Sequence, residues 1–217
     1  MMVFVQARMS SKRLPGKMSL PFKKYSSLLD AVVNPLSQLS AVTEVVVLTS
    51  SSVSDDSIYL NCKERGYQCF RGDLENVYAR FVDAVRFYKP KSFARLCGDS
   101  PLFSKEIIFS LISEFERNDY LYASNTLERS FPAGLSFEVV DSDAFDSEKF
   151  LTSKQHNKEH VTTAFSDPVY EGSRLSLRTS QVFEVSSYAV DTMRDYESLY
   201  NLEAPTIDAA LFVAERI

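Results

Sequence analysis

The residues best suited to chemistry lie in a short basic loop near the start of the chain. The apolar run Val3–Gln6 predicts a β-strand, and a loop at 8–17 follows it almost directly. This loop holds four cations, two serines and one glycine: Arg8, Ser10, Ser11, Lys12, Arg13, Gly16 and Lys17. Backbone N–H groups with Arg and Lys side chains neutralise phosphate charge. The loop therefore predicts a polyphosphate site, although its spacing is not that of a Walker A loop and a solvated surface loop is the alternative.

Two aspartates follow predicted strand ends that are far apart in the chain. Asp99 comes after Gly98, where the run at 92–97 ends, and Asp191 lies between the run at 188–190 and a helix. Mg²⁺ prefers one or two carboxylates completed by phosphate oxygens and water. Asp99 and Asp191 therefore predict a shared magnesium site. The alternatives are a turn or helix cap at Asp99 and an acid favoured by a helix terminus at Asp191.

Three further stretches carry weaker signals. Arg71, at another strand end, predicts a contact with the base or ribose of a nucleotide, while the nearby Asp73 equally suits an N-cap of the next helix. Residues 131–138 predict a loop and strand that line the side of a ligand cleft where an acceptor substrate would bind, although ordinary strand and turn chemistry explains them equally well. His156 and His160 have a spacing that would let both face one metal on a helix. We favour an exposed or hydrogen-bonded role for them, because the sequence offers no obvious third ligand.

Short apolar runs alternate with helical segments along the chain. The predicted strands lie at 3–6, 44–49, 67–70, 92–97, 120–123 and 135–140, with irregular strands or a hairpin at 175–177 and 182–185. The predicted helices lie at 26–40, 55–65, 75–88, 104–117 and 143–151, with two more starting at Thr192 and Thr206. This alternation predicts an α/β fold, with a Rossmann-like, mostly parallel sheet and helices on both faces. Ligands of such folds bind outside the carboxyl ends of the strands, so loops 7–17, 71–74 and 98–103 and the segment before Thr192 should converge.

Length and composition narrow the class of protein. The 217 residues, 45% of them hydrophobic, predict one globular domain spanning 1–217. A formal net charge of -5 argues against broad nucleic-acid binding, because no overall basic field attracts a phosphate backbone. Three cysteines without CxxC spacing predict neither a disulfide framework nor a zinc knuckle. With no apolar stretch of about 18 residues and no signal-peptide layout, we expect a cytoplasmic protein that does not span a membrane.

Six segments together resemble the cytidylyltransferase family, which includes the KDO and acylneuraminate cytidylyltransferases. They lie at 6–17, 71–81, 95–102, 131–140, 159–162 and 190–197, in the order of the family's motifs. The likeness spans nearly the whole chain and is greatest to the spore-coat polysaccharide biosynthesis branch, often called SpsF-like.

The resemblance implies the α/β fold of nucleotide-diphospho-sugar transferases, CTP as donor, Mg²⁺ as cofactor and a homodimer. It implies nucleotide contacts from Arg8, Ser11, Arg13, Lys17, Arg71 and Gly98, and metal contacts from Asp99 and Asp191. Arg13, Lys17 and Asp99 are the predicted catalytic residues. We expect transfer of CMP from CTP to an acidic sugar or a phosphorylated small molecule, with release of pyrophosphate, in surface polysaccharide or glycan synthesis. The acceptor is open, and another nucleotide donor remains an alternative.

The sequence departs from the branch pattern at a few positions. Ser10 replaces a glycine in the basic loop, which predicts a stiffer loop. Ala133 and Ser136 replace two acids of the acceptor-side motif, and Cys97 stands where threonine is common. These losses motivate a second hypothesis: a catalytically silent, nucleotide-binding relative that acts as a partner in the same pathway.

Overall fold

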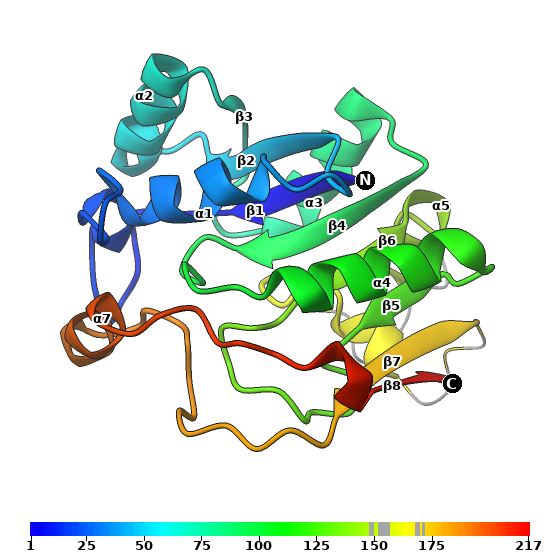
Figure 1. The fold of residues 1–217 in the computed structure, drawn as a ribbon. Coiled ribbons are helices and arrows are strands. Elements are labelled where there is room, and N and C mark those ends of the chain that lie inside the picture. The colour runs from blue at the N-terminus through cyan, green and yellow to red at the C-terminus, as the bar shows by residue number, and fades with distance from the viewer. Residues whose placement is uncertain (148–149, 152–156, 168–169, 171) are drawn as a thin grey trace.

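One continuous sheet forms the centre of the protein (Figure 1). The computed structural model describes residues 1–217 except 148–149, 152–156, 168–169 and 171. Its strands are β1 (Met2–Gln6), β2 (Glu44–Ser50), β3 (Gln68–Gly72), β4 (Ser92–Cys97), β5 (Tyr122–Ser124), β6 (Glu138–Asp141), β7 (Arg174–Thr179) and β8 (Phe212–Arg216). Its α-helices are α1 (Leu28–Leu36), α2 (Asp56–Arg65), α3 (Val77–Tyr88), α4 (Lys105–Arg117), α5 (Ser142–Phe145) and α7 (Met193–Tyr200). Short 3₁₀ turns lie at Lys17–Ser19, Val53–Asp55, Thr163–Ser166 and Ala209–Leu211.

The strand order confirms the predicted α/β class with a mostly parallel sheet. The strands lie in the order β3-β2-β1-β4-β6-β5-β7-β8. β3, β2, β1 and β4 are parallel neighbours, whereas β6 and β8 run antiparallel to the strands beside them. Gln6 at the end of β1 pairs with Cys97 at the end of β4, so the loops that follow these two strands leave the same edge of the sheet.

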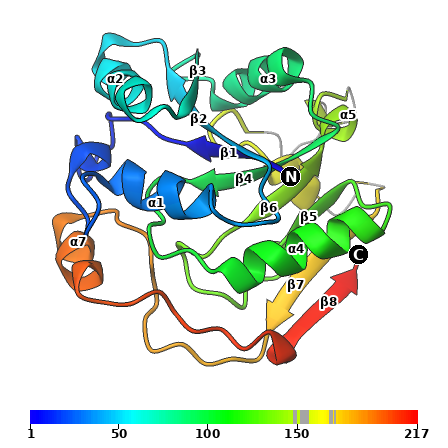
Figure 2. The same ribbon diagram turned by 45° about the horizontal axis from the view of Figure 1, so that its top comes forward.

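Helices cover both faces of the sheet, as the sequence predicts (Figure 2). In β1, Val3 and Val5 face a core that includes the apolar sides of α1 and α4, while Phe4 faces a second core that includes α3 and α5. This burial of both faces explains why the central strands read as nearly continuous apolar runs. Among the described helices, none is long and apolar enough to cross a lipid bilayer.

Local sequence signals set most helix ends. Ser104 caps α4, and at α7, which Thr192 opens as predicted, Thr192 and Asp195 form a capping box. Gly66 ends α2 in the left-handed region with φ +71°. Asp73, which equally suited an N-cap, does not cap α3: Asn76 does, and the Asp73 carboxylate accepts hydrogen bonds from the backbone of the preceding turn.

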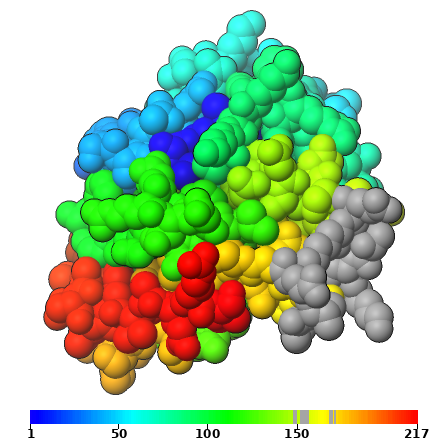
Figure 3. Space-filling view, turned by 90° about the vertical axis from the view of Figure 1, so that its right-hand side faces the viewer, coloured from blue at the N-terminus to red at the C-terminus, as the bar shows by residue number. Residues whose placement is uncertain are grey.

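The C-terminal part of the chain differs from the sequence prediction. The helix expected after Thr206 does not form; instead β8 pairs with β7 at the edge of the sheet. The space-filling view shows this segment (red) at the surface near α4 (green) (Figure 3). No strand forms at 182–185. The predicted helix at 143–151 begins as the short α5, and residues 148–149 lie outside the described residues.

Candidate active site

A cleft of about 380 Å³ opens at the carboxyl ends of β1 and β4. Six of the predicted site residues line it: Arg8, Ser11, Arg13, Lys17, Asp99 and Asp191. A larger groove of about 780 Å³ lies between α1 and the start of α4, but no predicted site residue lines it. The chemistry predicted from the sequence therefore gathers in the smaller cleft.

The Lys17 ammonium holds the two predicted metal-binding acids together. Its Nζ lies 2.7 Å from Asp99 Oδ2, 3.4 Å from Asp191 Oδ1 and 2.6 Å from the carbonyl oxygen of Val190. Arg13 Nη2 lies 2.9 Å from the same Asp191 oxygen. Lys17 is only 5% exposed, and a buried ammonium needs such partners to offset its loss of hydration. Two carboxylates that are far apart in the sequence thus face one cation.

Close backbone contacts bring these carboxylates together. Gly98 N–H donates to the carbonyl of Gln6 at 2.8 Å, and a Cβ at Gly98 would lie 3.0 Å from that oxygen. Val190 N–H donates to the carbonyl of Asp99 at 2.8 Å, which ties the segment before α7 to the loop after β4. The close backbone approach at Gly98 is to β1, and its predicted contact with a nucleotide stays a prediction.

The loop around Gly134 supports the segment that carries Asp191. Gly134 has φ +81°, and a Cβ there would lie 2.3 Å from the backbone nitrogen of Ala189. Tyr188 N–H donates to the carbonyl of Ala133 at 2.7 Å. In the described part of the chain, no residue of 131–138 lines the cleft. The acceptor-side segment therefore buttresses the acid pair through its backbone.

A buried carboxylate that the sequence reasoning missed anchors the basic loop. Asp55 is fully buried; its Oδ1 accepts from Met9 N–H at 2.8 Å, and its Oδ2 accepts from Ser50 N–H at 3.1 Å and from Ser50 Oγ at 2.5 Å. Gly16 N–H then donates to the Met9 carbonyl at 2.9 Å and closes the loop just before Lys17. Ser10 is not among the described residues with positive φ, so the loop needs no glycine at that position.

Arg8 and Arg71, two further residues predicted to contact the nucleotide, also have protein partners. Arg8 Nη2 lies 2.9 Å from Glu159 Oε1 at the rim of the cleft, and this hydrogen bond lowers the pKa of Glu159. Arg71 does not join the other residues: its guanidinium contacts Asp56 Oδ1 at 2.7 Å and the Ser50 carbonyl at 2.9 Å, and it lies outside the cleft lining. A role of Arg71 toward a nucleotide stays a prediction.

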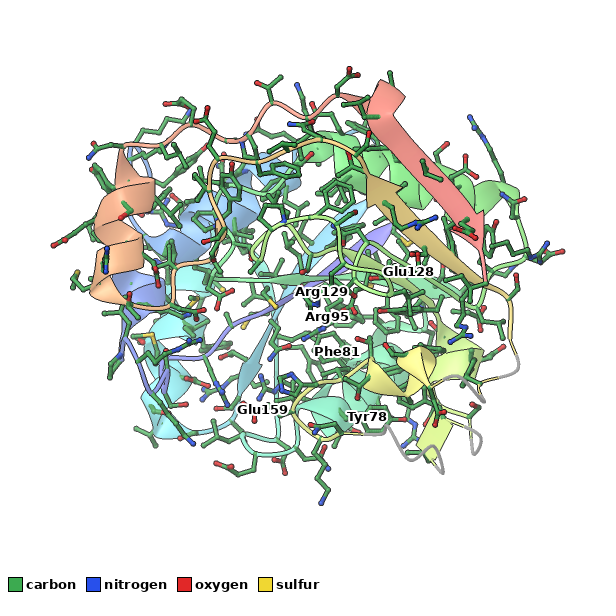
Figure 4. The ribbon with its side chains drawn as sticks, turned by 90° about the horizontal axis from the view of Figure 1, so that it is seen from below. Tyr78, Phe81, Arg95, Glu128, Arg129 and Glu159 are labelled. Carbon is green, nitrogen blue, oxygen red and sulfur yellow. The ribbon has the colours of Figure 1, made fainter. Side chains whose placement is uncertain are left out.

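A buried ion pair, also missed, lies beneath the cleft. Arg95 Nη1 donates to Glu138 Oε2 at 2.5 Å, while Tyr122 and Thr162 donate to Glu138 Oε1 at 2.5 and 2.6 Å. Burial alone would raise the pKa of Glu138, but the Arg95 charge and these hydrogen bonds hold it below its ordinary value. Figure 4 shows Arg95 near Phe81, whose ring centroid is 5.9 Å from the guanidinium. An arginine inside an otherwise apolar strand is the signal that could have revealed this pair.

The carboxylate oxygens of the cleft suit a magnesium ion whose remaining ligands come from phosphate and water. Within the described residues, no group of three or more His, Cys, Asp and Glu side chains could hold a metal alone. In the same part of the chain, Asp99 Oδ1 and Asp191 Oδ2 accept no hydrogen bond, so each carboxylate keeps an oxygen for a cation. His160 lines the cleft, whereas His156 lies outside the described residues.

The fold is that of the nucleotide-diphospho-sugar transferase-like cytidylyltransferases. A CMP:2-keto-3-deoxy-manno-octonic acid synthetase solved with CTP superimposes with a TM-score of 0.63 at 15% identity, over 91% of this chain and 95% of that one. The chain belongs to the cytidylyltransferase family, whose sequence profile matches residues 2–205.

Two relatives are similar over most of their length. The spore coat polysaccharide biosynthesis protein SpsF of Bacillus subtilis is 31% identical over 95% of this chain and 89% of its own. A cytidylyltransferase structure from Leptospira borgpetersenii has a TM-score of 0.81 and 26% identity, over 91% of this chain and 84% of that one. The family resemblance predicted from the six sequence segments is thereby confirmed.

Proposed function

We propose that the protein transfers CMP from CTP to an acidic sugar or a phosphorylated small molecule, with release of pyrophosphate, in the synthesis of a surface polysaccharide or glycan. The observation that carries the proposal is the meeting of Asp99 and Asp191 at the Lys17 ammonium, beside the basic loop. The name of the Bacillus subtilis relative supports the polysaccharide setting. The CTP bound to the structurally similar synthetase supports the donor.

In the proposed reaction, an acceptor oxygen forms a bond to the α-phosphorus of CTP. The bond from that phosphorus to the bridging oxygen of the β-phosphate breaks, pyrophosphate leaves with the electron pair, and the hydroxyl proton passes to solvent. Alignment and charge neutralisation supply most of the catalysis in such transfers. Arg13, whose side chain is 65% exposed, can follow the pyrophosphate as it leaves, with Arg8 and Ser11 nearby. Lys17, fixed by its three partners, keeps a positive charge at the base of the cleft.

Asp99 and Asp191 are the residues that would hold Mg²⁺, through the carboxylate oxygens that accept no hydrogen bond from the described residues. A bound Mg²⁺ ion supplies Lewis-acid polarisation of a phosphoryl oxygen. Lys17 neutralises the same two carboxylates, and this keeps them close together before any ligand binds.

Thermal shift measurements test the donor. CTP with Mg²⁺ should raise the melting temperature more than ATP or GTP with Mg²⁺ does, because at equal concentration the nucleotide that binds the folded state more tightly stabilises it more. Equal shifts for the three nucleotides would contradict the cytosine assignment.

A pyrophosphate-release screen tests catalysis. The protein is incubated with CTP, Mg²⁺ and a panel of acidic sugars and phosphorylated polyols. Release with one acceptor class supports the enzyme and names its acceptor. Binding of CTP without release across the panel would favour the silent relative. Gly134 and the backbone of Ala133 support the Asp191 segment without either replaced acid, which favours the enzyme.

A further inference from the structure

The side chain of Gln6 presents a hydrogen-bond donor to the cleft. Gln6 is the last residue of β1 and lines the cleft. Its Oε1 accepts from Arg95 Nη2 at 3.0 Å and from Arg95 Nε at 3.4 Å. A guanidinium only donates, so the amide oxygen must face Arg95 and the amide nitrogen must face away from it. In the described part of the chain, Gln6 Nε2 donates to no protein acceptor.

Buried partners prevent this amide from turning over. The Arg95 side chain is 14% exposed and is held by Glu138, which is itself fixed by Tyr122 and Thr162. A flip of the Gln6 amide would place two donors face to face in a buried setting, which is costly. The cleft therefore has a donor of fixed direction at the strand ends.

The electrical character of the cleft differs between its two ends. The loop end carries Lys12 and Arg13, which suits phosphates. At the end of β1, the Arg95 guanidinium that binds Gln6 is neutralised by Glu138, so this pair adds no net charge beside the Gln6 amide. A nucleotide whose phosphates bind at the basic loop would place its uncharged base at this second end.

We propose that Gln6 is a specificity residue that donates from Nε2 to the acceptor edge of the nucleobase. Cytosine offers N3 as an acceptor where uracil carries an N3–H, so a donor that cannot flip and that meets N3 favours cytosine, whereas a donor to O2 would serve both bases. Sites built to hydrogen-bond a polar edge discriminate well against partners that cannot complete the bond. This inference rests on the proposed function, because it takes a cytidine nucleotide as the ligand.

Two substitutions test the donor. Gln6→Glu keeps an acceptor for Arg95 and nearly the same shape but removes the N–H groups, and Gln6→Met removes them without adding charge. Calorimetric titration with CTP, UTP and inorganic tripolyphosphate separates the contribution of the base to the binding affinity from that of the phosphates. Both variants should bind CTP about tenfold more weakly, on the order of one net hydrogen bond. Both should bind tripolyphosphate as the wild type does, with melting temperatures confirming the fold.

Each other outcome has a defined meaning. CTP affinity that is unchanged in both variants would overturn the inference, and so would an equal loss of CTP and tripolyphosphate affinity, which indicates a general effect on the loop. A wild-type protein that binds CTP no more tightly than UTP would overturn the cytosine assignment and this inference with it. Preference for CTP in the wild type that survives in both variants would overturn the role of Gln6 alone and leave the proposed function standing.

Discussion

Lys17 links the basic loop to the acids of the cleft. Its ammonium contacts carboxylates from the loop after β4 and from the segment before α7, and its own backbone belongs to the loop after β1. Three distant stretches of chain therefore depend on one side chain for their mutual position. The geometry of the cleft is therefore sensitive to the loss of charge at either carboxylate.

Asp99→Asn removes one of the two charges in the acid pair. We expect turnover to fall by roughly a hundredfold or more, the scale seen when one charge-stabilising group is lost from an active site. Pyrophosphate release under saturating CTP measures this. Asp146→Asn is the control, because Asp146 pairs with Arg86 and does not line the cleft. Wild-type turnover in Asp99→Asn would remove Asp99 from the catalytic group.

At the scale of elements, the basic loop is held at its two ends by backbone hydrogen bonds. The Asp55 carboxylate accepts from the Met9 N–H group, and the Gly16 N–H donates to the Met9 carbonyl, so a single residue joins the loop to the end of β2 and to the turn that carries Lys17. The loop is thus fixed by residues that do not line the cleft themselves.

Asp55→Asn tests this anchor. The new amide offers one oxygen where two were used, which leaves a buried N–H of Met9 or Ser50 without its acceptor. We expect a loss of about 1–3 kcal/mol in the free energy of unfolding, measured by urea denaturation, and weaker CTP binding. Asp56→Asn is the matched control, since the neighbouring Asp56 is a half-exposed partner of Arg71. Equal effects in the two variants would argue against the anchor.

At the scale of the whole molecule, Arg95 and Glu138 join the two parts of the sheet. They face each other across β4 and β6, where the parallel half gives way to antiparallel pairing. The pair is buried, and breaking a buried pair costs roughly 3–5 kcal/mol because the remaining charge loses its partner.

The low pKa of Glu138 predicts how stability depends on pH. A carboxylate whose pKa is depressed by folding stabilises the folded state above its ordinary pKa, here 4.5, and this contribution is lost as the pH falls through the lower folded-state value. Melting temperatures measured from pH 8 to pH 3 should therefore drop steeply below about pH 4.5. Glu138→Gln should melt lower at neutral pH and show a shallower drop in acid. An identical acid slope in both proteins would contradict the assignment.

Sequence by itself determined the features that depend on neighbouring residues. The caps at Ser104 and Thr192, the stop at Gly66 and the buried strand β1 follow from short-range hydrogen bonding and from a local run of apolar residues, which a short stretch of sequence contains. The rule that ligands of parallel sheets bind outside the carboxyl ends of the strands also predicted that the basic loop and both aspartates share one cleft, and all three line it.

Only the tertiary structure decided which distant groups meet. The last segment reads as a helix, yet it forms β8, because the open edge of β7 offers backbone partners that local propensity does not include. Arg71 lies at a strand end as predicted, but Asp56 holds its guanidinium away from the cleft. Lys17 and Glu138 gain their partners from residues far away in the chain, and burial in a shared interior, which no local pattern encodes, makes those pairings necessary.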